Sequence, residues 1–368
     1  MSEANALERV PKMIYTASII YKMIFHLRYS KIGNMSQSTV RRFVFDLDKH
    51  PSERWIHIIN EYKDKLPRMK EEINKLFQEF GVTGLVRKAL NWLIYFYSNS
   101  IVHREEIASI AKLTNLDFEQ VLLMQLMYEI NSACSTLITH VDHKPVMFRT
   151  MDWDLDFLRE LTVELSVVKN GQEICVAPTW VGCVGFFTAY MKHEEGNYAI
   201  ALNYRRTFQS QEGGVWTVAN NLIRTLRLIW PCSYLIRDVC ENQYSFARAK
   251  NALTNTPIIS PCYLTLFHPT QSCIITRDAN TTVNVRENSL YQTNKDFGCY
   301  GNKNKDNIIW SSQREQFLTN LVTLNEDNFK SKEYLLERLF QWPIINVETI
   351  YQCLADETDI TTRTVPHL

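Results

Sequence analysis

The stretch from Tyr128 to Asp154 contains three residues whose types and spacing could perform acyl transfer: Cys134, Arg149 and Asp152. Cys134 begins a β-branched run, and a turn at residues 142–145 leads into a second strand-like run. A hairpin of this form would bring the arginine and the carboxylate back beside the start of the first strand. A thiol becomes a good nucleophile only beside a base or a positive charge, so this cluster predicts a nucleophilic site at the edge of a sheet.

A simpler interpretation fits the same three residues. A single cysteine at the head of a strand is most often a small buried hydrophobic residue. An arginine and an aspartate three positions apart most often form a surface ion pair. The three residue types alone leave both interpretations open.

The neighbouring residues favour catalysis, because they resemble the signature of the acid ceramidase and N-acylethanolamine acid amidase family. Residues 134–138 read CSTLI and residues 149–152 read RTMD. The family has a Cys-Thr-Ser-Ile-Val strand start followed by Arg-Asn-Met/Leu-Asp, one residue farther along. The preceding Tyr128-Glu129 also matches. The resemblance runs from about Phe43 to about Tyr351 and is greatest to the N-acylethanolamine acid amidases.

The resemblance implies the mechanism of an N-terminal nucleophile hydrolase. The chain would cut itself between Ala133 and Cys134, and the freed α-amine of Cys134 would act as the base for its own thiol. Asp152 would hold the ammonium form of that amine. Arg149 would favour the thiolate and fix the geometry of the cluster.

Further polar residues are implied by matches farther along the chain. Asn294 lies in a segment that resembles the family's x-Thr-Asn, so it would donate a hydrogen bond to the oxyanion of the intermediate. Supporting roles are implied for Asn203, Tyr204 and Arg314. Two departures are expected to affect leaving-group recognition or self-cleavage, because Tyr204 replaces a family glutamate and Lys295 replaces a family tyrosine.

Composition describes a globular chain with a sizeable core. The 368 residues are 45% hydrophobic, and 40 basic residues balance 40 acidic ones, so nothing indicates a nucleic acid partner. All nine cysteines lie at or after position 134 and none has Cys-x-x-Cys spacing. The sequence therefore predicts neither a metal site nor a cofactor, while disulfides and reduced core cysteines both stay compatible with it.

The chain divides into three parts around the nucleophile. Residues 1–40 would be a leader or extension: the apolar run at 13–27 is too short and interrupted for a membrane span, and no clean signal-peptide cleavage site follows it. Residues 41–133 would form a helical α-subunit, and residues 134–368 a catalytic β-subunit.

The expected elements follow from hydrophobic periodicity and turn residues. In residues 41–133 we expect one strand at 43–48 and helices at 56–63, 68–80, 85–97, 104–112 and 118–130. After Cys134 we expect strands at 134–139, 146–153, 161–169, 172–176, 181–190, 197–203, 262–267, 273–276, 281–285 and 290–293, with helices at 216–230, 233–253, 313–322 and 332–341. This pattern predicts an α+β fold. The resemblance implies the four-layer αββα sandwich of N-terminal nucleophile hydrolases, with an all-helical N-terminal part.

The helix expected at residues 85–97 is unusually aromatic. It fits a core helix, but it also fits a patch in which Trp92, Leu93 and Phe96 enter a membrane interface to collect lipid.

Together these features predict a lipid amide hydrolase without a cofactor. It would release a free fatty acid from an N-acylethanolamine or a ceramide at a membrane surface, as a heterodimer of its own α and β fragments, and the resemblance implies a lysosomal or secreted protein. Two alternatives stay open. One is a catalytically weak or inactive lipid-binding relative, and the other is a cysteine amidase that acts on small non-lipid amides.

Overall fold

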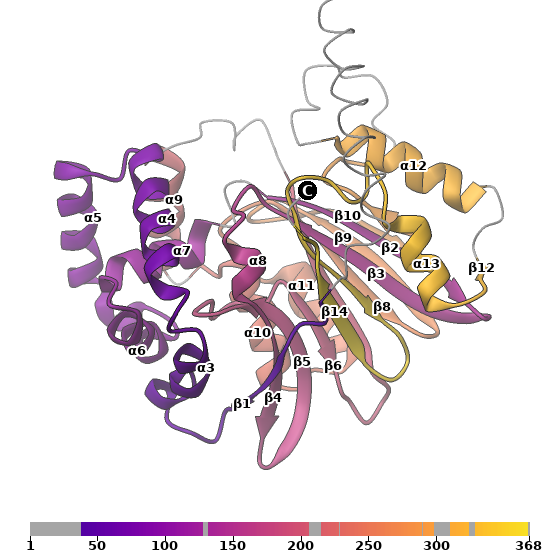
Figure 1. Cartoon of the computed structure of the whole chain (residues 1–368), viewed down its shortest axis with the longest axis horizontal. Helices are drawn as coiled ribbons and strands as arrows, with labels where there is room; N and C mark the ends of the chain where they lie inside the picture. Colours follow the sequence, from indigo (N-terminus) through magenta and orange to yellow (C-terminus); the bar gives the residue numbers. More distant parts are fainter. Residues whose placement is uncertain are drawn as a thin grey trace, which may run out of the picture.

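Two stacked β-sheets with helices on both outer faces form the body of the protein (Figure 1). A computed structural model describes residues 38–127, 132–205, 215–227, 229–288, 290–297, 310–323 and 328–366. The expected α+β architecture, a four-layer αββα sandwich with N-terminal helices beside it, is confirmed. Most of the leader predicted at 1–40, together with Tyr128 and Glu129, lies outside the described residues.

The first sheet has eight strands and receives one strand from the N-terminal part of the chain. β1 (Arg42–Asp46) pairs parallel with β4 (Thr162–Lys169), and antiparallel pairing continues across the rest of the sheet. The Asn170-Gly171 turn has positive φ at both residues, 52° and 74°, as a tight two-residue hairpin requires. The remaining strands, in spatial order, are β5 (Gln172–Trp180), β6 (Thr188–Met191), β7 (Tyr198–Tyr204), β8 (Cys262–His268), β9 (Gln271–Arg277) and β10 (Thr282–Glu287).

The second sheet is built on the predicted hairpin, which is confirmed. β2 (Ala133–Val141) and β3 (Lys144–Asp152) pair antiparallel around a two-residue turn at Asp142-His143. Two strands that the sequence analysis did not predict, β13 (Thr349–Ala355) and β14 (Ile360–Thr364), extend the sheet beyond β3. The short strands β11 (Tyr291–Gln292) and β12 (Asn328–Phe329) both pair with β2.

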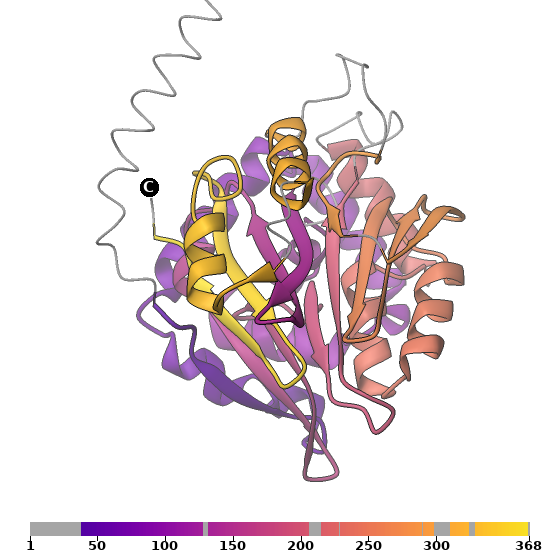
Figure 2. The same ribbon diagram turned by 90° about the vertical axis from the view of Figure 1, so that its right-hand side faces the viewer.

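Helices cover the outer face of each sheet (Figure 2). α10 (Cys232–Glu241) and α11 (Phe246–Asn255) contact the eight-stranded sheet, while α12 (Ser311–Thr323) and α13 (Lys332–Leu339) contact the other. The single helix expected at 233–253 was wrong. Gln243 adopts a positive φ of 48°, which ends α10 and starts a new helix direction.

The N-terminal helices lie at one end of the sandwich and share its core (Figure 1). In α4 the buried positions recur at helical spacing and form one apolar face. The N-terminal helices are η2 (Pro51–Glu53), α3 (Ile56–Glu61), α4 (Leu66–Glu79), α5 (Gly84–Phe96), η3 (Ser98–Ser100), α6 (Arg104–Thr114) and α7 (Phe118–Met127). Two further helices come later in the chain, α8 (Leu158–Leu161) and α9 (Val215–Leu226).

The strand expected at 181–190 is present only over β6. Gly182 has φ +82°, and the backbone N–H of Val184 donates to Oε1 of Gln125 instead of to a neighbouring strand (2.8 Å). Residues 181–187 therefore form an irregular loop, because part of their backbone bonds to Gln125 on α7 and to Ser233 on α10.

Candidate active site

The head of the β2–β3 hairpin brings the predicted nucleophile and its neighbours together. Ala133 lies opposite Asp152, and Thr136 lies opposite Arg149. Because alternate residues of a strand face the same side, Cys134 and Arg149 both point between the two sheets. Cys134 is completely buried in the uncut chain.

Every polar group of Cys134 contacts a residue that the sequence analysis selected. Its backbone N–H donates to Oδ1 of Asn294 (2.7 Å), and its carbonyl oxygen accepts from Nη1 of Arg314 (2.5 Å) and Nδ2 of Asn203 (3.3 Å). Sγ lies 3.5 Å from Nη2 of Arg149. The chain thus places a thiol beside a fixed positive charge.

Buried hydrogen bonds fix the Arg149 guanidinium in place. Nη2 donates to the carbonyl oxygen of Leu202 on β7 (2.7 Å), and Nη1 donates to the hydroxyl of Tyr351 on β13 (3.1 Å). Arg149 therefore ties the two sheets together at the nucleophile, and its position does not depend on a substrate.

Asp152 and Arg314 form a buried ion pair behind the nucleophile. Nη1 of Arg314 lies 3.5 Å from Oδ2 of Asp152, and Nδ2 of Asn346 donates to the same oxygen (3.4 Å). Burial raises the pKa of Asp152, and the positive charge of Arg314 opposes that rise. Within the described part of the chain, the buried Oδ1 of Asp152 has no hydrogen-bond partner, so it can accept one more hydrogen bond.

Asn294 is held with its amide oriented. Oδ1 accepts from both the N–H of Cys134 and Nη2 of Arg314 (2.9 Å), which assigns this atom as the oxygen. Nδ2 donates one hydrogen to the carbonyl oxygen of Tyr204 (2.7 Å). An amide nitrogen carries two hydrogens, so one remains for an oxyanion.

The loop that carries Asn294 is anchored two residues farther on. Arg205 donates to both carboxylate oxygens of Asp296, from Nε to Oδ1 (2.7 Å) and from Nη2 to Oδ2 (2.8 Å). Tyr204 supplies a backbone carbonyl to the site, while its buried side chain packs against Ala133. Where the resemblance implies a glutamate, the chain therefore has an apolar contact with Ala133.

The sequence analysis missed the contributions of the segment around β13. Asn346 contacts Asp152, and Tyr351 contacts Arg149. Glu348 lies between Asn346 and Tyr351 in the sequence. Burial and the nearby charges of Asp152 and Asp154 raise the pKa of Glu348 to about 7, with Arg314 opposing. The run TIYQCLA at 349–355 is rich in β-branched and aromatic residues, a strand signal that could have found this segment.

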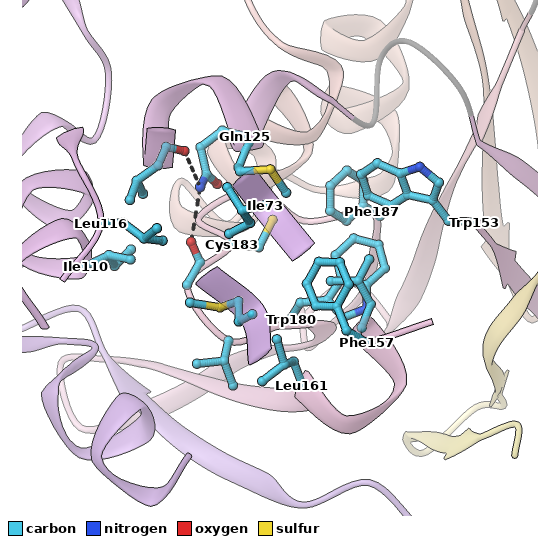
Figure 3. Close-up of a pocket in the computed structure, with 16 residues that line it drawn as sticks. Ile73, Ile110, Leu116, Gln125, Trp153, Phe157, Leu161, Trp180, Cys183 and Phe187 are labelled. Atoms are coloured by element: carbon cyan, nitrogen blue, oxygen red, sulfur yellow. Dashed lines mark hydrogen bonds between the residues drawn. The ribbon is translucent and has the colours of Figure 1, made fainter. Parts of the chain in front are cut away.

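A small apolar pocket lies between the N-terminal helices and the sheets (Figure 3). Ile73, Leu116 and Met124 line it from the N-terminal side, and Trp153 and Phe187 from the other. The ring of Trp180, also in its lining, lies 5.5 Å from that of Trp153 and 6.1 Å from that of Tyr351, which contacts Arg149. One ring contact and one hydrogen bond therefore separate the pocket lining from Arg149.

The aromatic residues of α5 do not line this pocket. Trp92 and Phe96 are 64% and 62% exposed, and their rings contact each other at 4.4 Å. Leu93 is partly buried and packs against the core, so less of its side chain is available to a lipid surface than of its two neighbours. Tyr95, which was not selected, is 77% exposed beside Phe96.

Three further observations concern metal ligands, membrane spans and disulfides in the described part of the chain. No group of three metal-ligating side chains occurs among the described residues. None of the helices in the described ranges is long and apolar enough to cross a membrane. No disulfide joins any two of the eight cysteines that the structure describes, and Cys299 lies outside the described residues.

Comparison with known proteins finds similarity to acid ceramidase and to N-acylethanolamine-hydrolyzing acid amidase. A family model described as the beta subunit of N-acylethanolamine-hydrolyzing acid amidase matches residues 38–97. An uncharacterized protein of Acanthamoeba polyphaga mimivirus is 33% identical over 308 residues, which cover 83% of this chain and 93% of the viral protein. The acid ceramidase of Homo sapiens is 25% identical, over 90% of this chain and 87% of its own length.

A solved structure is similar in fold. The Caenorhabditis elegans N-acylethanolamine-hydrolyzing acid amidase ortholog superposes with a TM-score of 0.51 at 20% identity, over 63% of this chain and all of the solved chain.

Proposed function

We propose, from the premise that this chain belongs to the acid ceramidase and N-acylethanolamine acid amidase family, that it hydrolyses a lipid amide to a free fatty acid. The substrate would be an N-acylethanolamine or a ceramide. The nucleophile would be Cys134, exposed by self-cleavage between Ala133 and Cys134. Residues 41–133 and 134–368 would then be the α and β fragments of one enzyme.

One observation carries the proposal: a single cluster contacts Cys134 on its thiol, its N–H and its carbonyl oxygen. A cysteine that serves only as core would not need a buried guanidinium beside its thiol, because that charge must itself be desolvated. Arg149, Asn294 and Arg314 are all buried there, and buried charged and polar groups of this kind are common at functional sites.

Self-cleavage would begin with attack of Sγ on the carbonyl carbon of Ala133. The C–N bond to Cys134 breaks, its nitrogen gains the thiol proton, and a thioester joins Ala133 to Sγ. Water then hydrolyses the thioester, leaving a carboxylate on Ala133 and a free α-amine on Cys134. The unfilled Oδ1 of Asp152, on the residue opposite Ala133, is a suitable acceptor for the new ammonium group.

In turnover the same atoms would act on a lipid amide. The α-amine takes the proton of Sγ, and the thiolate, stabilised by Arg149, attacks the substrate carbonyl. The second hydrogen of Asn294 Nδ2 would stabilise the oxyanion. The ammonium returns the proton to the leaving amine, and water hydrolyses the acyl thioester to the fatty acid.

The surroundings favour a lipid over a small amide. The apolar pocket offers an acyl chain a lining of aromatic and aliphatic side chains, and its Trp180 contacts the Tyr351 that binds Arg149. The exposed aromatic residues of α5 suit a membrane interface, where a water-insoluble substrate would be collected. Action in a lysosome or outside the cell, as the family resemblance implies, belongs to the same proposal.

The decisive test is mass spectrometry with N-terminal sequencing of the purified chain, before and after mild acid treatment. Two fragments are expected, the larger beginning Cys-Ser-Thr-Leu-Ile, with Cys134→Ala remaining one chain. The cut protein should hydrolyse a fluorogenic fatty acyl amide. An active protein with the bond intact would refute the α-amine mechanism, and a cut protein without Cys134-dependent turnover on ethanolamides, ceramides or short amides would refute the enzyme.

A further inference from the structure

A chain cut before Cys134 would have no covalent link across the cut. None of residues 1–133 is a cysteine, so no disulfide can join them to residues 134–368. The two products would stay together only through non-covalent contacts, and the structure shows which ones are specific.

Arg42 joins the N-terminal product to both sheets of the other product. Its Nε donates to Oε2 of Glu164 on β4 (2.8 Å), and its Nη1 donates to Oδ2 of Asp359 beside β14 (2.9 Å). Its Nη2 donates to the carbonyl oxygen of Ile360 (2.7 Å). One side chain thus holds β1 across the edge where the two sheets meet, with Glu164 almost fully buried beneath it.

The backbone around Arg42 follows the same path. The N–H of Val40 donates to the carbonyl oxygen of Thr362 (3.1 Å) in the six-stranded sheet. Two residues later the chain enters β1, a parallel strand of the eight-stranded sheet. Residues 38–46 therefore form a strap that is hydrogen-bonded to both sheets of residues 134–368.

A second ionic contact lies in the interior. Arg237 on α10 donates from Nη1 to Oε2 of Glu106 (2.8 Å) and from Nη2 to Oε1 (2.6 Å), and both side chains are completely buried. Arg54 and Trp55, from the same product as Glu106, also donate to its carboxylate. A bidentate ion pair is geometrically specific, so it fixes the position of α6, which carries Glu106, relative to α10.

We propose that Arg42 and Glu106 hold the N-terminal product in register on its own C-terminal product once the chain has been cut, an inference that rests on the proposed self-cleavage. The apolar core stabilises the association of the two products, but the hydrophobic effect is non-directional and does not set their register. Charged pairs supply the register, because a slip of β1 along β4 by one residue would move Arg42 from Glu164 and turn it to the other face. The pocket requires this register, since both products line it.

The Glu106 pair is also suited to acidic surroundings. Burial raises the pKa of Glu106, but the charge and hydrogen bonds of Arg237, the charge of His103 and the hydrogen bond from Arg54 outweigh burial and hold the pKa at about 2. A carboxylate whose pKa is lowered by folding keeps its ion pair until the pH falls toward that value.

The experiment measures association of the two products after cutting. Wild type, Arg42→Ala, Glu106→Gln and the matched control Arg41→Ala would be cut, diluted in series at moderate urea, and assayed by native mass spectrometry. Arg41 is the neighbouring arginine, but it pairs with Glu61 inside its own product. We expect the dissociation constant of the products to rise about tenfold for Arg42→Ala and about a hundredfold for Glu106→Gln, since removing one partner leaves buried charge unpaired.

Arg41→Ala should remain within twofold of wild type, on the scale of an exposed pair. Equal dissociation constants for all four proteins would overturn the proposal. If Glu106→Gln does not fold, the comparison of Arg42→Ala with Arg41→Ala decides alone. If wild type never cuts itself, self-cleavage fails, but the same measurement on a chain cut by an added protease at a recognition sequence inserted before Ser132 still tests the two contacts.

Discussion

The buried cluster at Cys134 and the exposed face of α5 use their side chains in opposite ways. At Cys134, charged and polar groups from β2, β3, β7, α12 and the loop after β11 are held by hydrogen bonds at fixed positions. On α5, Trp92 and Phe96 are mostly exposed and contact each other.

The difference predicts how each region responds to change. Removing one member of a buried network leaves its partners unpaired in a low dielectric, so each effect should be large and should not depend on how substrate is presented. Removing an exposed aromatic ring costs the folded protein little, so its effect should appear only when a lipid surface is present.

The strongest test of the buried side is Asp152→Asn. The amide cannot neutralise the α-ammonium of Cys134, and it leaves Arg314 without its counter-charge. We expect both self-cleavage and turnover to fall about a thousandfold or more, as for members of a catalytic unit. The matched control is Asp154→Asn, two residues along the chain and exposed, which should keep most activity. Comparable losses in both variants would contradict a special role for Asp152.

The next test is Asn294→Ala. Loss of one oxyanion donor should lower kcat on a fluorogenic acyl amide by roughly a hundredfold to a thousandfold, with KM changed less. Self-cleavage should also slow, because Oδ1 of Asn294 accepts a hydrogen bond from the backbone nitrogen of Cys134, which is the leaving group in that step. Thermal unfolding should show that the fold persists. A kcat near the wild-type value would show that the donor lies elsewhere.

Asp152 and Asn294 could both be selected from the sequence. The residues that hold them in place, such as Asn346 before β13, could not. The hairpin was predictable because its turn residues and β-branched runs act locally. β13 was missed because all seven of its residues are buried, so it shows no alternation of apolar and polar side chains. The helices of residues 41–127 were found to within a few residues, since their apolar faces recur at helical spacing.

Other misses arose from partners that are distant in sequence. The apolar run 181–187 resembled a strand, but its hydrogen bonds go to Gln125 on α7 and to Ser233 on α10. Arg314 was selected only as a loose support, yet the fold places it against Cys134, Ser135, Asp152 and Asn294 at once. Such convergence depends on chain topology, which local patterns do not encode.

The exposed side of the comparison is tested by replacing Trp92 and Phe96 together by Ser. Hydrolysis of substrate in vesicles should fall by about tenfold, since the two rings supply apolar area to the interface. Hydrolysis of a soluble chromogenic amide should not change. Leu93→Ser is the contrast, because its partly buried side chain should affect stability and both substrates. Equal loss on both substrates for the double variant would mean that α5 does not contact lipid.

The smallest expected effect belongs to Glu348, at the edge of the buried cluster. With its pKa raised to about 7, this carboxyl is neutral in mild acid and becomes an anion as the pH rises past neutrality. The anion repels the Asp152 carboxylate and draws on the charge of Arg314, so it should weaken the cluster only on the alkaline side.

Glu348→Gln should therefore match wild type below about pH 6 and retain two- to threefold more activity near pH 8, an effect of the size expected for one partly screened charge. The stability difference has the same sign, because an acid whose pKa is raised by folding stabilises the fold less as the pH rises through that pKa. The measurement is kcat/KM and Tm across pH 5–8, with Glu337→Gln, an exposed glutamate of α13, as control. A pH profile that moves equally in both variants, or in neither, would show that Glu348 does not act on Asp152.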